Sequence, residues 1–274
     1  MNGTSPFSLK DKTIVITGAT GILGASFTLE VARAGANVVV LGRNLERAEE
    51  RVQAIEAIGG TAIAVLADVL DEGALITAKD TVVAKFGHIH GLVNAAGGNM
   101  PGAVVQPQQD IFKLNMDALK QVVELNLFGT LLPTQVFGAS IANATGSGSI
   151  VNISSVSAKL PLTRVLGYSM AKAAIESYTK WFAIEQASRY GDAIRMNAIV
   201  PGFFLTEQNK ALLTQEDGTY TSRGGDVIRH TPYKRFGKAN ELTGALIWLL
   251  SDASSFVTGT TIAVDGGFTA YSGV

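Results

Sequence analysis

Tyr168 and Lys172 are the two residues of this sequence whose types and spacing most directly suggest chemistry. They stand four residues apart in the stretch VLGYSMAKAA, residues 165–174. On a helix this spacing places both side chains on one face, about one turn apart. A phenol that titrates near ~10 is a poor base at neutral pH, and a neighbouring ammonium favours its ionised form. The pair indicates either a tuned proton donor and acceptor or an ordinary solvated helix pair, and the spacing alone does not decide.

Composition restricts the classes of protein that could contain this pair. Of the 274 residues, 47% are hydrophobic and 16% charged, which is enough apolar material for a large core. A net charge of −1 without basic runs gives no reason to expect nucleic acid or an anionic membrane as a partner. The absence of cysteine excludes thiol chemistry, and three unpaired histidines give no reason to expect a metal site. Without a long apolar segment, we expect a cytoplasmic protein with no membrane span.

Short apolar runs alternate with longer amphipathic segments and define the elements that must position the pair. The runs predict strands at 13–17, 37–42, 61–68, 90–96, 148–154, 194–200 and 260–265, and the segments predict helices at 22–34, 44–58, 73–86, 108–143, 167–190 and 239–251. Regular alternation of this kind is typical of a parallel sheet with right-handed crossovers. We expect a single doubly wound α/β domain over residues 1–274. The long polar segment 203–238 is expected to form a lid or binding loop.

A glycine-rich turn follows the first predicted strand directly. The segment TGATGILG, residues 17–24, places Gly18, Gly21 and Gly24 at the start of the next predicted helix. Glycines there permit a tight turn and the close approach of a pyrophosphate, for which the helix N-terminus supplies N–H donors and a favourable dipole. We expect a dinucleotide site at this turn, with a plain glycine-rich turn as the alternative.

The end of the second predicted strand bears on which dinucleotide binds. Folds that prefer NAD usually carry an acid there for the ribose hydroxyls, but here Gly42 occupies the position and Arg43 follows it. Loss of the carboxylate removes repulsion of a 2′-phosphate, and a guanidinium can pair with one. The pattern favours NADP, with NAD as the alternative if Arg43 is an ordinary exposed arginine. After the third strand, Asp68 and Val69 could reach the adenine, or Asp68 could cap the next helix.

These motifs, together with several that follow them, resemble the short-chain dehydrogenase/reductase superfamily over almost the whole chain. TGATGILG resembles its cofactor turn, and VNAAG (93–97), ELNLFGT (124–130), GSIVNISS (148–155), YSMAK (168–172), NAIVPGFFLT (197–206) and FVTGTTIAVDGG (256–267) follow in the family's order. Ser155 precedes Tyr168 by 13 residues, as the family's geometry requires. Two positions depart from the common pattern, because Ile22 fills a usual glycine site and Ala95 replaces an asparagine.

The resemblance implies a role for each residue near the pair. Tyr168 would be the general acid/base, Lys172 would lower its pKa and bind the nicotinamide ribose, and Ser155 would hold the substrate oxygen. Asn126, through its main-chain carbonyl and a water, would complete a proton path from Lys172 to solvent. The implied cofactor contacts are Gly18, Thr20, Gly21, Ile22, Arg43, Asn44, Asp68, Val69, Asn94, Ala96, Gly97, Tyr168, Lys172, Pro201, Phe204 and Thr206. The implied fold is a single-domain Rossmann fold with a seven-stranded sheet, and the implied assembly is a homotetramer, with a dimer as the second choice.

A narrower resemblance, in PGFFLTEQN, RHTPYKRFG, LLSDASSFVTG and VDGGFTAYSGV, is to the D-mannonate oxidoreductase (fructuronate reductase) group. It implies a small sugar-acid substrate, D-fructuronate or D-mannonate. Arg164, four residues before Tyr168, could bind its carboxylate through two parallel hydrogen bonds. Asn99, Gln208 and Asn209 could bind sugar hydroxyls. The cations of the 203–238 segment (Arg223, Arg229, His230, Lys234 and Arg235) could touch substrate or simply be solvated.

Other functions are compatible with the same fold, because fold does not fix function. A gluconate 5-dehydrogenase-like or 3-oxoacyl reductase activity would use the same three residues, Ser155, Tyr168 and Lys172. A non-catalytic NADP-binding regulator would not need them, so their presence argues against that class. Turnover of cofactor with a panel of keto acids separates these alternatives.

Overall fold

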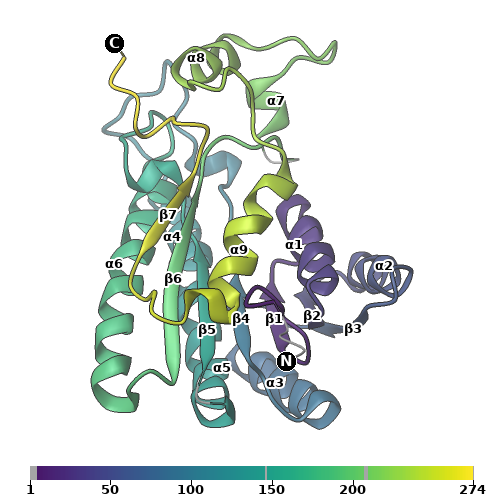
Figure 1. Cartoon of the computed structure of the whole chain (residues 1–274). Coiled ribbons are helices and arrows are strands. Elements are labelled where there is room, and N and C mark those ends of the chain that lie inside the picture. The colour runs from purple at the N-terminus through teal and green to yellow at the C-terminus, as the bar shows by residue number, and fades with distance from the viewer. Residues whose placement is uncertain (1–4, 146, 207–208, 274) are drawn as a thin grey trace.

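Seven parallel strands form one continuous sheet in the computed structural model of the protein, which describes residues 5–145, 147–206 and 209–273. The strands are β1 (Thr13–Thr17), β2 (Asn37–Gly42), β3 (Thr61–Leu66), β4 (Gly91–Asn94), β5 (Gly148–Ile153), β6 (Ile194–Pro201) and β7 (Thr261–Val264). Their order is β3-β2-β1-β4-β5-β6-β7, so the chain reverses direction across the sheet after β3 (Figure 1). The predicted doubly wound Rossmann-type fold is confirmed.

Helices cover both faces of the sheet. The longer ones are α1 (Ile22–Arg33), α2 (Leu45–Glu56), α3 (Glu72–Phe86), α4 (Met116–Val123), α5 (Gly129–Thr145), α6 (Leu166–Tyr190), α8 (Ser222–His230) and α9 (Thr243–Leu250). Shorter turns are η1 (Pro101–Ala103), η2 (Glu124–Phe128), η3 (Val156–Ala158), α7 (Lys210–Leu213), η4 (Ala239–Leu242) and η5 (Asp252–Ser254). None of the helices in the described part of the chain is long and apolar enough to cross a membrane.

The central strand β1 shows why the apolar runs become buried strands. Ile14 and Ile16 belong to one buried cluster, with residues of α1, α2 and α9, whereas Val15 between them belongs to a second cluster with residues of α3 and α5. Successive side chains of a strand point to opposite faces. Because helices cover both faces, every position of β1 is buried and the strand reads as continuously apolar.

The predicted helix over 108–143 is wrong in its start and in its regularity. Helix α4 begins only at Met116, where the Asn115 Oδ1 accepts a hydrogen bond from the Ala118 N–H (3.0 Å). After Val123 the chain forms the π-helical turn η2 before it continues as α5. Such turns are rare and occur mostly as single insertions in α-helices, frequently at functional sites. Here the turn contains Asn126.

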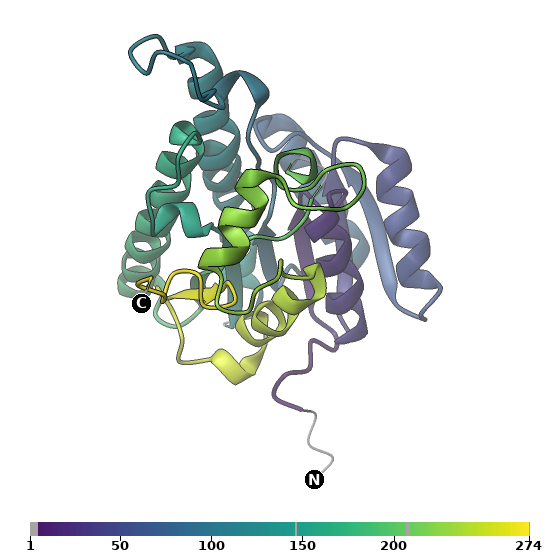
Figure 2. The same ribbon diagram turned by 90° about the horizontal axis from the view of Figure 1, so that it is seen from above.

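The segment 203–238 lies over the carboxyl edge of the sheet, with α7 and α8 above the strand ends (Figures 1 and 2). Its two ends are joined at its base, because the Gly237 N–H donates to the Phe203 oxygen (2.9 Å) and Phe204 pairs with Gly237. A Cβ at Gly237 would lie 2.4 Å from the Phe204 ring, which explains the glycine. The predicted contact Gln208 lies outside the described residues.

Candidate active site

A cavity of about 610 Å³ opens at the carboxyl edge of the sheet, beneath the 203–238 segment. It lies where the strand order reverses, which is the usual ligand position in open parallel sheets. Ser155, Tyr168 and Lys172 line it together, although Ser155 follows β5 and the other two residues lie on α6. Of the other predicted site residues, Gly97, Asn99, Arg164, Pro201, Phe204, Thr206 and Asn209 also line the cavity.

Tyr168 and Lys172 share one face of α6, as their spacing predicted. The Lys172 Nζ lies 5.4 Å from the centre of the Tyr168 ring and donates to the Ile153 main-chain oxygen (2.8 Å). Lys172 is 4% exposed, so its ammonium is almost completely removed from solvent. The hydroxyl of Ser155 forms a side-chain hydrogen bond with the phenol of Tyr168. The three side chains therefore form one connected group at the floor of the cavity.

Burial controls the pKa of both ionisable groups at this floor. It raises the pKa of Tyr168, against a smaller lowering by the hydrogen bond with Ser155. It lowers the pKa of Lys172 to about 8, because an ammonium loses hydration when buried. In the protein alone, the pKa of Tyr168 is thus raised by burial and is not lowered by Lys172 as expected. The phenol is protonated at neutral pH, and the ammonium remains mostly charged.

Asn126 holds the main chain at one side of this floor. Its side chain is buried in the π-helical turn, donates to the Gly98 oxygen (2.7 Å) and accepts from the Gly98 N–H (3.0 Å). A Cβ at Gly97 would lie 2.6 Å from the Asn126 Oδ1 and 3.4 Å from the Lys172 Nζ, so glycine lets these groups converge. The Asn126 main-chain oxygen, expected to bind a water, accepts the Thr130 hydroxyl (2.8 Å).

A buried carboxylate that the sequence analysis did not single out supports the Ser155 side of the floor. Glu176 lies one turn beyond Lys172 on α6 and is 7% exposed. Its carboxylate accepts from the Ser154 hydroxyl (3.0 Å) and pairs with the Lys159 Nζ (2.6 Å). Both partners flank Ser155, so Glu176 fixes the loop that carries it. The signal available in the sequence was an acid four residues after Lys172, on the same buried face.

The glycine turn provides the space and the donors that a dinucleotide needs. A Cβ at Gly24 would lie 2.3 Å from the Gly18 oxygen, so these two glycines are required by the fold itself. Gly21, the N-cap of α1, would bring its Cβ no closer than 3.4 Å to any atom, and no side chain caps the helix there. The first N–H groups of α1 therefore face outward without a protein side-chain partner, as a phosphate site requires. Next to them, Ile22 is exposed (39%). The residues at this turn fit the pyrophosphate of a dinucleotide.

The adenine end of the predicted cofactor site is more exposed. The Arg43 Nη1 lies 3.4 Å from the Asp68 Oδ2, and the Arg43 side chain is 72% exposed. The alternative in which Asp68 caps α3 is wrong, because Asp71 is the N-cap and accepts from the Ala74 N–H (3.0 Å). Gly42 lies against Thr20, whose Cγ2 would be 2.9 Å from a Cβ there.

Four further predicted cofactor contacts are not among the residues that line the cavity. The Asn44 side chain caps α2 by accepting from the Arg47 N–H (2.9 Å), and Val69 is buried beside Gly129. The buried Asn94 side chain points into the core, where it donates to Thr134 (2.9 Å) and Asn152 (2.9 Å). Its main chain leads into Ala96, whose N–H donates to the Thr17 hydroxyl (3.1 Å). The Asn94 side chain thus ties β4 to β5 and α5 rather than facing the cavity.

The predicted substrate residues that the structure describes, Asn99, Arg164 and Asn209, line the same cavity. Asn99 accepts from the Met100 N–H (2.9 Å), and Asn209 accepts from the Thr206 N–H (2.8 Å) and donates to the Phe204 oxygen (2.8 Å). Both amides therefore shape the loops that line the cavity. Arg164 lines it as well, as does Arg223 of α8, which the sequence did not distinguish from four other cations of the same segment.

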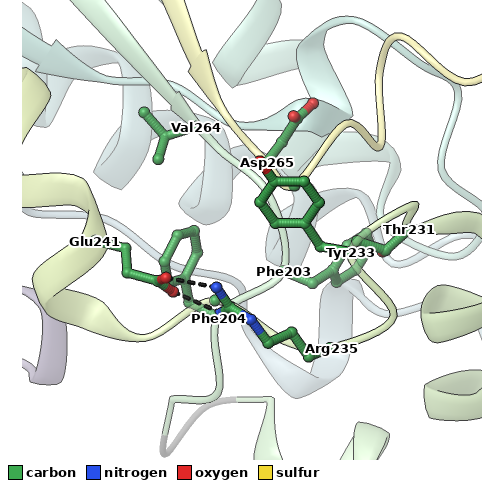
Figure 3. A pocket seen from close by; sticks show the side chains of 10 residues that line it. Phe203, Phe204, Thr231, Tyr233, Arg235, Glu241, Val264 and Asp265 are labelled. Carbon is green, nitrogen blue, oxygen red and sulfur yellow. Dashed lines mark hydrogen bonds and ion pairs between the residues drawn. The ribbon is translucent and has the colours of Figure 1, made fainter.

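Figure 3 shows a second, smaller cavity of about 90 Å³ at the base of the 203–238 segment. There Arg235 donates twice to Glu241 (2.7 and 2.6 Å), which lowers the pKa of Glu241 to about 2. The Asp265 carboxylate accepts the Gly267 and Thr269 N–H groups and so holds the turn after β7. Ser155, Tyr168 and Lys172 line the larger cavity and not this one. We interpret the smaller cavity as a structural junction.

Comparisons with known proteins agree with this geometry. The family model described as enoyl-(acyl carrier protein) reductase, a short-chain dehydrogenase/reductase model, matches residues 18–269. An uncharacterized oxidoreductase, UxuB, of Bacillus subtilis (strain 168) is 45% identical over 276 residues, which are 97% of this chain and 98% of that protein.

Two solved structures are similar over nearly their full length. A candidate D-mannonate oxidoreductase from Haemophilus influenzae with bound NAD has a TM-score of 0.90 and 40% identity, covering 97% of this chain and 98% of the other. A gluconate 5-dehydrogenase from Burkholderia cenocepacia J2315 in complex with NADP and tartrate has a TM-score of 0.84 and 32% identity, with the same coverage. The chain therefore belongs to the short-chain dehydrogenase/reductase family, and it is an NAD(P)-dependent oxidoreductase.

Proposed function

We propose that the protein interconverts a secondary alcohol and a ketone of a sugar acid, D-mannonate and D-fructuronate, with NADP(H). The observation that carries the proposal is the group of Ser155, Tyr168 and Lys172 in a cavity that Arg164 also lines. The similar candidate D-mannonate oxidoreductase and gluconate 5-dehydrogenase structures support a sugar acid as the substrate class. In this proposal the 203–238 segment is the substrate lid of a single domain spanning residues 1–274.

Tyr168 moves the proton at the reacting oxygen. Because burial raises the pKa of its phenol, Tyr168 is the acid that protonates the carbonyl oxygen during reduction. In the oxidation direction it accepts the alcohol proton, and the nearby Lys172 ammonium stabilises the phenolate that results. The nicotinamide, when bound, accepts or supplies the hydride. Ser155 holds the same substrate oxygen, since its hydroxyl already hydrogen-bonds the phenol.

Lys172 and Asn126 complete the proposed machinery. The Lys172 Nζ donates to Ile153 and so uses one of its three donors, which leaves the others for the cofactor ribose and a proton path. We assign the role of Asn126 to its position beside Gly97 and Gly98, where it orders the main chain near Lys172. The proposal includes a proton path from Lys172 to solvent through the Asn126 main-chain oxygen and a water.

NADP is the proposed preferred cofactor, because of the residue types at Gly42 and Arg43. Gly42 offers no carboxylate to the ribose hydroxyls, and the exposed Arg43 is close enough to the adenine end to meet a 2′-phosphate. The Haemophilus structure contains NAD, so the preference of this chain must be measured directly.

The test of the proposed function is direct turnover. Purified protein is assayed for loss of NADPH absorbance with D-fructuronate, and for its gain with D-mannonate, next to D-gluconate, 5-ketogluconate and a 3-oxoacyl thioester. We expect the highest kcat/KM with D-fructuronate or D-mannonate. Preference for gluconate or its keto acid would replace the assigned substrate by the one that the Burkholderia enzyme's name states, and preference for the thioester would overturn the sugar-acid class.

We propose a homotetramer in the cytoplasm as the working form. Helix α6 exposes Met170 (55%), Trp181 (59%) and Ile184 (68%) along one side, and Phe128 (53%) is exposed beside α5. Apolar residues in such number on neighbouring helices suit a symmetric contact between copies. Light scattering is expected to give four times the 28.7 kDa chain mass, and Trp181→Glu to dissociate it. A monomer at micromolar concentration would contradict the assembly.

A further inference from the structure

The cavity carries more positive charge than Lys172 alone supplies. Its described lining residues include the cations Arg164, Lys172 and Arg223, and they include no aspartate or glutamate. Lys172 lies at the floor with Tyr168, whereas Arg164 belongs to the loop before α6 and Arg223 to α8 of the lid. A cavity with this balance of charge attracts anions, because buried or half-buried charges are screened less than surface ones.

Arg164 is held in place by neutral partners. Its Nε donates to the Val105 oxygen (2.8 Å) and its Nη2 to the Gln106 Oε1 (3.0 Å). The two bonds orient the planar guanidinium and occupy two of its five N–H groups. The main chain of Arg164 adopts a φ of 76°, an uncommon conformation for a residue with a side chain that persists where the surroundings enforce it. The protein thus fixes a guanidinium at this position without neutralising it.

Arg223 reaches the same loop from the lid. Its Nη1 donates to the Thr163 hydroxyl (3.2 Å) and its Nη2 to the Thr163 oxygen (3.3 Å). Burial and the charge of Arg164 both lower the pKa of Arg223, and the charge of Asp226 raises it by less, which means that Arg164 and Arg223 lie within each other's field. The nearest acid on α8, Asp226, forms an ion pair with Arg229. Two like charges therefore face each other across the junction between lid and body.

We propose that Arg164 and Arg223 together bind the carboxylate of the substrate. A carboxylate between them would relieve the repulsion and accept charge-assisted hydrogen bonds from both guanidinium groups. Because one arginine belongs to the body and the other to the lid, the bound carboxylate would also hold the lid against residues 163–164. The inference rests on the proposed function for its choice of a sugar acid and adds Arg223 as the specificity-determining residue.

Equilibrium binding tests the inference independently of turnover. D-mannonate, D-gluconate, inorganic phosphate and the neutral polyol D-mannitol are titrated by calorimetry into the protein and its variants loaded with NADPH, the reduced cofactor, which cannot accept a hydride from these alcohols. We expect Arg223→Gln and Arg164→Gln each to weaken binding of the sugar acid about 10- to 100-fold, the range of a lost charge-assisted hydrogen bond pair. Binding of D-mannitol should not change, and Arg223→Lys should recover only part of the loss, because lysine lacks the planar fork.

A matched control removes a lid charge outside the cavity. Lys210→Gln deletes one cation from α7 of the same segment, and Lys210 is exposed and not among the described residues that line the cavity. Its affinity for the sugar acid should equal that of the unmodified protein. Equal losses in Lys210→Gln and Arg223→Gln would overturn the local site in favour of a general field effect.

The outcomes separate this inference from the proposed reaction. Arg223-dependent binding of D-mannonate without turnover would leave the carboxylate site standing and reject the assigned reaction. Turnover of D-mannonate with an unchanged KM in Arg223→Gln would support the reaction and overturn the site. Absence of sugar-acid binding, tighter binding of phosphate, or equal loss of D-mannitol and D-mannonate binding would each overturn the carboxylate assignment.

Discussion

At the floor of the cavity, Lys172 of α6 and the buried Asn126 behind it are each fixed by the main chain of a neighbouring segment. Lys172 donates to the Ile153 oxygen, Asn126 binds Gly98 in both directions, and Gly97 has no room for a Cβ. Arg164 instead binds Val105 and Gln106 from the loop before α6, and Arg223 of α8 binds Thr163, so these contacts join loops and a lid helix. Lys172 and Asn126 are thus held next to the ends of the sheet strands, whereas Arg164 and Arg223 are held by segments outside the sheet.

This difference between the two groups corresponds to the different requirements of proton transfer and of substrate recognition. Proton transfer requires groups held within a few tenths of an ångström, and buried main-chain partners supply that rigidity. Recognition of one sugar acid among several requires a set of side chains that can differ without disturbing the floor. We therefore expect changes on the sheet side to abolish chemistry, and changes on the loop side to alter which molecule is bound.

The largest effect is expected at the floor. Tyr168→Phe should lower kcat by about 10³-fold or more, because it removes the proton donor and leaves the ring that fills the site. Cofactor affinity, measured by fluorescence titration, should be nearly unchanged. A variant with near wild-type turnover would break the comparison, since the sheet side would then not carry the chemistry.

Two glycines of the turn at residues 17–24 are expected to have different roles, one in stability and one in cofactor binding. Gly24→Ala should destabilise the protein by about 3 kcal/mol or more, because its methyl would lie 2.3 Å from the Gly18 oxygen. The added methyl group of Gly21→Ala has room within the protein, so the free energy of unfolding in urea should stay within about 0.5 kcal/mol of the wild-type value. It should nevertheless bind the cofactor at least about tenfold more weakly, because the methyl occupies the approach of the pyrophosphate. Unchanged cofactor affinity in Gly21→Ala would remove the turn from the proposed site.

The free-energy cost of burying the Lys172 ammonium can be measured from the stability of the protein. Burial lowers its pKa from 10.5 to about 8, so between these values the unfolded state binds more protons than the folded state and stability rises with pH. Below about pH 8 the buried charge costs on the order of 3 kcal/mol, partly offset by about 1 kcal/mol for the bond to Ile153. Lys172→Met should therefore be inactive yet more stable at pH 7, with a smaller advantage at pH 9.5.

Urea unfolding of both proteins at the two pH values checks this expectation. A less stable Lys172→Met protein at pH 7, or a stability difference that does not depend on pH, would show that burial of the ammonium is not the controlling factor.

The smallest effect is expected at the exposed adenine end, which belongs to neither group. Arg43→Leu should reduce the NADP over NAD preference in kcat/KM about tenfold, because solvent screening limits the value of an exposed ion pair. The Gly42→Asp change that would complete a switch to NAD must also displace Thr20, so it should be made together with Thr20→Ala. An unmodified protein that prefers NAD would refute the assignment of Arg43 as a phosphate ligand.

The strands and the floor could be predicted because their signals are local. Continuous apolar runs marked every strand, and the spacing of Ser155, Tyr168 and Lys172 follows from one strand end and one helix. The predicted strands 61–68 and 90–96 end early, at Leu66 and Asn94, and directly beyond Asn94 the chain lines the cavity with Ala95.

The features that could not be predicted depend on contacts between distant segments. The sequence gives no periodic signal for the π-helical turn at Asn126, whose side chain hydrogen-bonds Gly98, a residue 28 positions earlier in the chain. Likewise, Arg223 resembles the other lid cations until α8 is placed over Thr163. Asp68 could not be separated from Asp71 as a cap, because both precede α3 and only the main-chain geometry selects Asp71.

The reversal of strand order also has a consequence for biosynthesis. The side of β1 that finally meets β4 must wait for residues made much later, as the bond from the Thr13 N–H to His90, 77 residues further on, illustrates. At about 5–20 residues per second, translation leaves that edge without its partner for roughly 4–15 s. An unpaired apolar strand edge is a template for aggregation. During translation the edge of β1 must therefore be protected from aggregation until β4 has emerged from the ribosome.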